Sequence, residues 1–507
     1  MNSDTSSNNK RIAKNTLLLY FRMLFTMIVT LYTSRVILQV LGIEDFGIYN
    51  VVAGVISFMG FINGCMNTTT SRYITFALGK GNKKEVNEIF NTAFHIHAII
   101  ALIVILFSET IGVWFIEYKL NIPPGKILDA HIIFQFATAN IFLNILTVPY
   151  SALIVAHEKM SIYAYIAIVD VIIKLIIVFL LQLFAENRLI YYGLFLLSSQ
   201  VLQNMIYHYY CKKKYEESAL RRIVTPCPLF KEMLSFASWS MFTNISGLMS
   251  TQGLNILLNL FFGPTINASR GIAVQVQGAV NRFCVNMQTA FNPQITKSYA
   301  SNEWDYTRSL ILNSSRFSFF LLLFLSIGLL TETPYIIHLW LGSVPDYVCP
   351  FVQWMLCTSI VEALCNPIGT TLLATGHIKI YQSAVGFLLL SIVPISWCLL
   401  QFGFNPESVF VVHFVVTIMA LTVRLCLVRK YIGLTFENYF KRCIRPITTV
   451  TLSLCFVIFI YYKTTSFHAV LNIAFCLATS LIIIYWIGLT RNERHLVNKR
   501  CTKLLHL

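Results

Sequence analysis

The chain has 507 residues, of which 56% are hydrophobic and 12% are charged, and its mean hydropathy is +0.67. Soluble domains carry about 25% charged residues, so this composition excludes an ordinary soluble protein, and it excludes disorder, collagen and a disulfide scaffold as well. The net charge of +16 lies mostly in short segments between long apolar runs, which is typical of membrane topology signals and not of nucleic-acid binding. The sequence therefore predicts an all-α polytopic membrane protein.

About fourteen apolar segments follow one another along the chain. Each is near the ~20 residues that a helix needs to cross a bilayer. The links between them are short, so the segments are expected to form one bundle. They cover residues 15–41, 46–70, 88–115, 128–155, 163–184, 189–210, 236–262, 270–293, 309–330, 349–374, 380–403, 407–428, 446–463 and 469–489.

The basic residues of the links alternate from one side of the membrane to the other. With the N-terminus inside, 27 of the 38 Lys and Arg residues lie on the cytoplasmic side, four lie on the opposite side and seven lie within segments. Lysine and arginine accumulate in the cytoplasmic loops of membrane proteins. We therefore expect a bacterial inner-membrane protein with both termini in the cytoplasm.

The two halves of the chain repeat each other. Residues 149–156 align with residues 367–374, and Leu41-Gly42 matches Phe262-Gly263. The offset is six segments, so the repeats are parallel, as in some transporters. This pattern predicts two six-helix lobes related by a pseudo-two-fold axis. The expected parts are an N-terminal lobe at 1–210, a basic cytoplasmic linker at 211–235, a C-terminal lobe at 236–428, and two extra helices with a basic tail at 429–507.

Seven cations lie inside apolar segments, where polar groups are functional candidates. Seven cations facing lipid would cost on the order of 20 kcal/mol, which exceeds the stability of a typical protein. Most of them must therefore face a wet interior or lie near a helix end. They are Arg22, Arg35, Lys174, Arg270, Arg282, Arg316 and Arg424.

Four segments carry polar or small residues along one helical face. The segments at 15–41 and 46–70 are the repeat partners of those at 236–262 and 270–293, which predicts a single cavity between the lobes. Close helix packing is the alternative, and it has about equal weight for the segment at 46–70. The predicted cavity residues are Arg22, Thr26, Asn50, Asn67, Asn244, Thr251, Asn255, Arg270, Gln275, Arg282, Asn286 and Arg316.

Acidic residues are rare inside the segments. Asp170 and Lys174 are spaced i, i+4 and can pair on one helix face, whereas Glu362 has no local partner. These residues form either structural ion pairs or a site that couples transport to H+ or Na+, because a desolvated carboxylate can exchange protons. The sequence has no ATP-binding loop and no hydrolase motif, and it predicts no metal site, no other cofactor and no enzymatic activity.

The polar-faced segments contain runs that resemble a known family. Residues 34–50, SRVILQVLGIEDFGIYN, are similar to the "LG…FGxY" opening of polysaccharide exporters of the Wzx-type O-antigen flippase branch, in the MATE/oligosaccharidyl-lipid flippase superfamily. Residues 67–73, 77–82 and 148–160 resemble the same family, and the fourteen-segment plan extends the resemblance over the whole chain. These motifs are more specific for the superfamily than for a substrate.

The resemblance implies a V-shaped bundle that moves undecaprenyl-pyrophosphate-linked oligosaccharide units from the cytoplasmic to the periplasmic leaflet by alternating access. The product would serve O-antigen, capsule or exopolysaccharide assembly. Arg22 and Arg282 would suit the anionic pyrophosphate. The expected partners are the lipid-linked oligosaccharide, membrane lipids, and the polysaccharide polymerase and chain-length machinery, with no nucleic acid.

Three other functions are compatible with this sequence. A multidrug exporter of the same superfamily usually has twelve segments and carries cationic drugs, and a peptidoglycan lipid flippase shares the fold. An intramembrane polymerase or transferase belongs to another class. Such an enzyme is expected to carry a large periplasmic loop and acids clustered at one face of the membrane.

Overall fold

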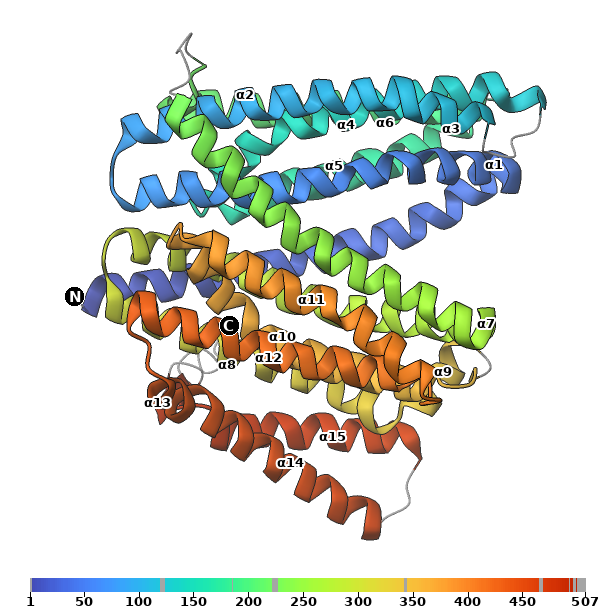
Figure 1. Ribbon diagram of the computed structural model, residues 1–507. Coiled ribbons are helices and arrows are strands. Elements are labelled where there is room, and N and C mark those ends of the chain that lie inside the picture. Colours follow the sequence, from blue (N-terminus) through green and yellow to red (C-terminus); the bar gives the residue numbers. More distant parts are fainter. Residues whose placement is uncertain are drawn as a thin grey trace. The chain divides into compact units, whose positions relative to one another are not determined.

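The structure is a computed structural model that describes residues 2–118, 124–184, 186–220, 227–341, 344–464, 468–491, 493–495 and 498 (Figure 1). Every regular element of these residues is a helix, which confirms the predicted fold class. The first half forms α1 (Asn2–Gly79), α2 (Lys83–Phe107), η1 (Ser108–Gly112), α3 (Val113–Tyr118), η2 (Pro124–Lys126), α4 (Ile127–Ala156), α5 (Met160–Leu181), α6 (Arg188–Lys214) and η3 (Glu216–Ser218). The second half forms α7 (Cys227–Ala300), α8 (Trp304–Thr331), α9 (Thr333–Leu341), α10 (Val348–Ala374), α11 (Ile378–Gln401), α12 (Ser408–Ile432), α13 (Phe436–Tyr439), η4 (Phe440–Ile444), α14 (Arg445–Thr464), α15 (Ala469–Ile483) and η5 (Ile484–Gly488).

Eleven helical stretches of the described residues are long and apolar enough to cross a membrane. They correspond to eleven of the expected segments. The remaining three expected segments are the two halves of α1 and the second half of α7. Both long helices are helical throughout except at Gly42 in α1 and at Gly263 in α7. The chain is therefore a multi-pass membrane protein.

The chain divides into two compact units, which do not follow the sequence strictly. Unit 1 consists of Met1–Met241 together with Thr296–Asn302, and unit 2 consists of Phe242–Ile295 and Glu303–Leu507. Both ends of α7 thus belong to unit 1, while its long middle belongs to unit 2. The two extra C-terminal helices are part of unit 2.

A glycine bends α1 and α7 at equivalent points. Gly42 has φ 78° and ψ 172°, and Gly263 has φ 81° and ψ −175°. This backbone conformation is essentially restricted to glycine. Figure 1 shows both long helices turning sharply. The match agrees with the repeat in the sequence, where Leu41-Gly42 aligns with Phe262-Gly263.

The interior of unit 1 is apolar and lies around α4. Phe134 and Ile133 of α4 pack with Ala101 and Val104 of α2 and with Leu189 of α6. A second cluster joins the first half of α1 to α5 and α6. Its buried members are Val36, Ile37, Val40, Leu41, Ile177, Val178, Leu181 and Tyr192. The second cluster therefore packs the end of the first half of α1 against α5 and α6.

Amide side chains fasten the second half of α7 within unit 2. The Gln277 amide donates to Ser359 Oγ of α10 at 2.8 Å, and the Gln288 amide donates to Ser318 Oγ of α8 at 3.0 Å. Asn366 of α10 donates to Gln288 Oε1 at 3.1 Å. A buried amide that kept no partner would be costly, so these bonds fix the rotation of α7 about its axis.

Polar contacts attach the extra C-terminal helices to α8. Glu332, the residue after α8, accepts hydrogen bonds from Tyr462 at 2.6 Å and from Asn472 at 2.7 Å. Arg316 in the middle of α8 forms an ion pair with Glu493. The extra helices are thus attached at the end of α8, and the tail that follows them is attached at its middle, in addition to apolar packing.

Candidate functional site

In unit 1 the predicted cavity residues of α1 lie beside α5. The Arg22 guanidinium is 4.8 Å from the centroid of the Tyr163 ring, a distance at which a cation is attracted to the aromatic face. Arg22 and Thr26 are half-buried, and Asn67 is exposed. The side chains of Asn50 and Arg35 lie outside the described residues.

The pairing predicted for Asp170 and Lys174 is present in α5. Lys174 Nζ lies 2.7 Å from Asp170 Oδ2, and Ser199 of α6 donates to Asp170 Oδ1 at 3.3 Å. Tyr207 of α6 is within electrostatic range of both Asp170 and Arg22. Asp170 thus pairs with Lys174 and Ser199, while Arg22 of α1 lies on Tyr163 of the same helix as Asp170. The role of Asp170 in coupling stays a prediction.

In unit 2, Arg270 connects the two halves of α7. Its guanidinium donates to Asn255 Oδ1 at 3.0 Å and to the Thr251 carbonyl at 2.7 Å, and the side chain is buried. Because Thr251 and Asn255 precede the bend at Gly263 and Arg270 follows it, these bonds stabilise the bend.

The stripe on the second half of α7 is more accessible. Arg282 and Gln275 are exposed, as is Asn244 on the first half of the helix. Asn286 is buried and donates to the Arg282 carbonyl at 2.7 Å. Arg282 thus differs from Arg270, whose guanidinium is occupied by bonds within α7.

The other predicted cation of unit 2 has an acidic partner. The Arg316 side chain is 6% exposed and pairs with Glu493, which lies 177 residues further along the chain. A buried pair of this kind fixes the position of two helices more than it attracts a ligand. The sequence places Glu493 in the basic tail, where no local pattern connects it to Arg316.

Glu362, the second predicted coupling residue, is half-buried in α10. It lies within electrostatic range of His413 and Arg424, both on α12, and His413 is also within range of Arg270. The sequence predicts Arg424 as a cation inside a segment, whereas His413 was not among the predicted residues. The available signal was a histidine inside one apolar segment of the C-terminal lobe, together with an acid that has no local partner in another segment of the same lobe. The coupling role of Glu362 stays a prediction.

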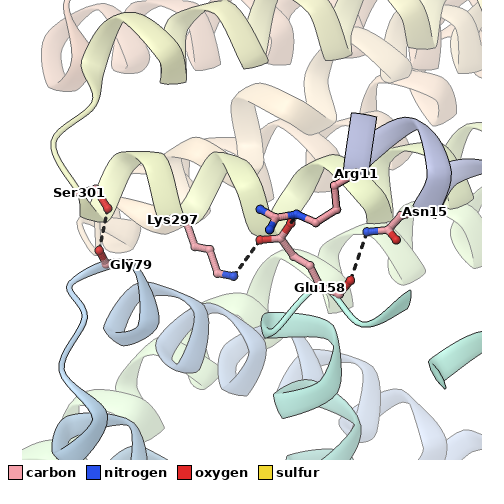
Figure 2. A network of polar contacts seen from close by, with 6 residues as sticks. All are labelled: Arg11, Asn15, Gly79, Glu158, Lys297 and Ser301. Carbon is pink, nitrogen blue, oxygen red and sulfur yellow. Dashed lines mark hydrogen bonds and ion pairs between the residues drawn. The ribbon is translucent and has the colours of Figure 1, made fainter. Parts of the chain in front are cut away.

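A charged network that the sequence analysis did not predict joins three parts of unit 1 (Figure 2). Glu158, in the link between α4 and α5, is 2.8 Å from Arg11 Nε and 2.8 Å from Lys297 Nζ. The Asn15 amide donates to the Glu158 carbonyl at 3.2 Å. Burial lowers the pKa of Lys297 from its ordinary value, while Glu158 acts in the opposite direction. The only sequence signal is an acid in an otherwise basic link.

No group of three His, Cys, Asp or Glu side chains that could hold a metal ion occurs within the described ranges. The histidine of the α4–α5 link, His157, instead stacks on Tyr215 with ring centroids 4.2 Å apart. In unit 2, His377 stacks on Tyr431 in the same way at 5.2 Å. Each unit thus pairs the histidine that follows α4 or α10 with a tyrosine at the end of α6 or α12.

Comparison with known sequences identifies related proteins. The family described as "Polysaccharide biosynthesis protein" matches residues 12–299. The "Uncharacterized membrane protein EpsK" of Bacillus subtilis (strain 168) is 20% identical over 282 residues, which is 56% of this chain and 56% of that protein. The match therefore spans about half the length of this relative.

Comparison with solved structures identifies the fold. A multidrug resistance MATE family transporter of the MOP superfamily, in an outward-facing conformation, superposes with a TM-score of 0.71 at 14% identity, over 84% of this chain and 96% of that one. A MATE protein in the bent conformation gives 0.73 at 13% identity, over 85% and 97%. A MOP superfamily transporter from Pyrococcus furiosus Vc1 (DSM3638) gives 0.67 at 14% identity, over 83% and 96%. The chain therefore has the fold of MATE transporters.

Proposed function

We propose a transport function on one premise: the chain belongs to the polysaccharide biosynthesis protein family. The observation that carries the proposal is that a member of this family has the fold of MATE transporters. Fold and family are both of the transporter type, not the catalytic type. A lipid-linked saccharide is the biosynthetic intermediate that requires such a transporter, because its sugars cannot cross the apolar bilayer unaided.

The proposed cargo is an undecaprenyl-pyrophosphate-linked oligosaccharide, moved from the cytoplasmic to the periplasmic leaflet by alternating access. A pyrophosphate is anionic and attracts guanidinium groups. Arg22 of unit 1 and the exposed Arg282 of unit 2 support this cargo best. Arg270 and Arg316 are less available, since α7 and Glu493 occupy their guanidinium groups.

The proposed location is a bacterial inner membrane, with both termini in the cytoplasm. The excess of basic residues in alternate links supports this orientation. The proposed partners are a polysaccharide polymerase and chain-length machinery, and the product is O-antigen, capsule or exopolysaccharide. No catalytic step is required of the chain.

The energy source is proposed to be a proton or sodium gradient acting through acids within the membrane. Asp170 with Lys174 and Glu362 with its neighbours His413 and Arg424 are the candidates. Glu362 is the stronger of the two, because a histidine in its electrostatic field offers a second protonatable group. Asp170 already has a cation and a hydroxyl on its carboxylate.

Deletion of the gene in its own host tests the function. The expected result is loss of a surface polysaccharide, with complete repeat units accumulating on undecaprenyl pyrophosphate at the cytoplasmic face. Arg22→Ala and Arg282→Ala should fail to restore the glycan at normal protein levels, whereas Arg282→Lys should restore part of it. Lys441→Ala is the matched control, because Lys441 is exposed and pairs only with the exposed Glu437 of its own helical turn.

The alternatives predict different phenotypes. A multidrug exporter, which the likeness to a multidrug resistance transporter favours as second candidate, would leave the surface glycan intact and make the deletion strain drug-sensitive. A truncated or unpolymerised glycan would instead indicate an intramembrane polymerase or transferase.

A further inference from the structure

We propose that Glu158 and its two cations form a latch that releases the C-terminal end of α7 during each transport cycle. The inference rests on the proposed transport function for its purpose, but the latch itself can be measured without transport. Three observations support it: the network in Figure 2 converges on one carboxylate, α7 is divided between the two units, and both cations are partly exposed.

The network converges on a single buried group. The Glu158 side chain is 1% exposed and is contacted by Arg11 of α1 and Lys297 of α7. Next to it, Ser301 donates to the Gly79 carbonyl at 2.6 Å. The backbones approach closely here, because a Cβ added to Gly79 would lie 2.7 Å from the Ala300 Cβ. Glu158 therefore fixes the end of α7 against the rest of unit 1.

The place of α7 in the chain makes this attachment consequential. Thr296–Asn302 belong to unit 1, whereas the preceding residues of the same helix, Phe242–Ile295, belong to unit 2. Any movement of that middle portion is therefore limited by what holds Thr296–Asn302 in unit 1. Alternating access requires such movements. The attachment is either permanent or released in each cycle.

The start of α7 is attached by a different kind of contact. The Arg72 guanidinium lies 4.5 Å from the Tyr73 ring centroid and 5.3 Å from that of Phe236, and both aromatic side chains are buried. Tyr73 also donates to Glu232 at 3.0 Å. Separating buried aromatic rings would expose a large apolar area to water. We therefore assign the start of α7 to the permanent attachment.

The end of α7 is held by charges that water can replace. Arg11 is 47% exposed and Lys297 is 24% exposed, so water already reaches both cations and can replace the carboxylate when the pairs separate. The attraction between buried charges is largely offset by the cost of removing them from water. Separation consequently costs little, while the closed geometry stays specific. These are the properties of a releasable contact.

Hydrogen–deuterium exchange of the full chain in lipid nanodiscs tests the latch. In the wild type, amides of residues 296–302 should exchange faster than those of residues 232–241, because the end of α7 opens and its start does not. Glu158→Gln should accelerate exchange at 296–302 roughly tenfold, with little change at 232–241. Gly79→Ala should give the same local pattern, because its added methyl group prevents docking without changing any charge.

Further variants separate a latch from a general loss of stability. Lys297→Met added to Glu158→Gln should have almost no extra effect, since the pair is already broken. Glu437→Gln, which removes an exposed ion pair of unit 2, is the control and should leave residues 296–302 unchanged. Equal exchange at both ends of α7 in the wild type, or acceleration over all of unit 1 in Glu158→Gln, would overturn the latch.

The outcome is independent of the cargo. If residues 296–302 open selectively but deletion of the gene leaves the surface glycans intact, the latch is supported and the proposed function is rejected. If residues 296–302 stay closed but deletion of the gene abolishes the glycan, only the latch is rejected.

Discussion

Gly263 is a position where a single methyl group should destabilise the fold through the backbone alone. Its backbone has φ 81° and ψ −175°, a region that is accessible essentially to glycine alone. A Cβ at this position would meet no atom within 4 Å, so any cost of Gly263→Ala comes from the backbone and not from crowding. The expected destabilisation is about 1–3 kcal/mol.

Gly278 supplies the matched control in the same helix. A Cβ added there also meets no atom within 4 Å, and the residue has no positive φ. Alanine favours a helix interior over glycine by ~1 kcal/mol, so Gly278→Ala should stabilise the protein slightly. The two variants add the same group to the same helix and should differ in stability by about 2–4 kcal/mol, with opposite signs.

Thermal unfolding of the purified variants in detergent measures this difference. Gly263→Ala should unfold several degrees below the wild type, and Gly278→Ala at or above the temperature of the wild type. Gly42→Ala tests the repeat, because Gly42 has nearly the same backbone angles and also has no atom within 4 Å of an added Cβ. Equal unfolding temperatures for Gly263→Ala and Gly278→Ala would refute the bend at Gly263.

Two further predictions concern buried charge. Glu493→Gln leaves the buried Arg316 without its anion and should lower the free energy of unfolding by about 2–4 kcal/mol. The double variant Arg316→Met/Glu493→Met should recover most of the lost unfolding temperature, because no buried charge remains. A double variant as unstable as the single one would contradict this. Burial lowers the pKa of His157 below its ordinary value of 6.5, so its contribution to stability is full above pH 6.5 and is lost as the pH falls through the lowered pKa. The unfolding temperature should therefore fall less on acidification in His157→Phe, which keeps the stacking on Tyr215, and an unchanged pH profile would contradict the assignment.

The sequence was sufficient where the structure is determined by nearby residues. Apolar segments of ~20 residues predicted the membrane helices, and the matching dipeptides Leu41-Gly42 and Phe262-Gly263, which indicated a repeat, mark the two positions where the structure has equivalent bends. The pair of Asp170 and Lys174 follows from helical spacing, and it is present at 2.7 Å. In each case the relevant residues are close together in the sequence, or the same pattern occurs in both repeats.

The charged contacts that the sequence did not reveal connect distant residues. Glu493 is 177 residues from Arg316, and Lys297 is 139 residues from Glu158. The chain has 22 acidic residues and 38 Lys and Arg residues, and only the packing of helices decides which of them meet. The basic links predict an orientation in the membrane, but they contain no information on which of their charges is buried.

The second half of α7 shows why a polar helix face has two meanings. Gln275 and Arg282 of the predicted polar face are exposed. Two amides outside that face, Gln277 and Gln288, donate instead to α10 and α8. Both sets recur at helical spacing, because a helix in a bundle has neighbours on one side and an accessible face on another. Periodicity identifies a face but not what the face contacts. The amides fix the rotation of the helix about its axis, so they determine where Arg282 points. Replacing Gln288 by Leu should therefore weaken the anion binding that we propose for Arg282, at an unchanged charge.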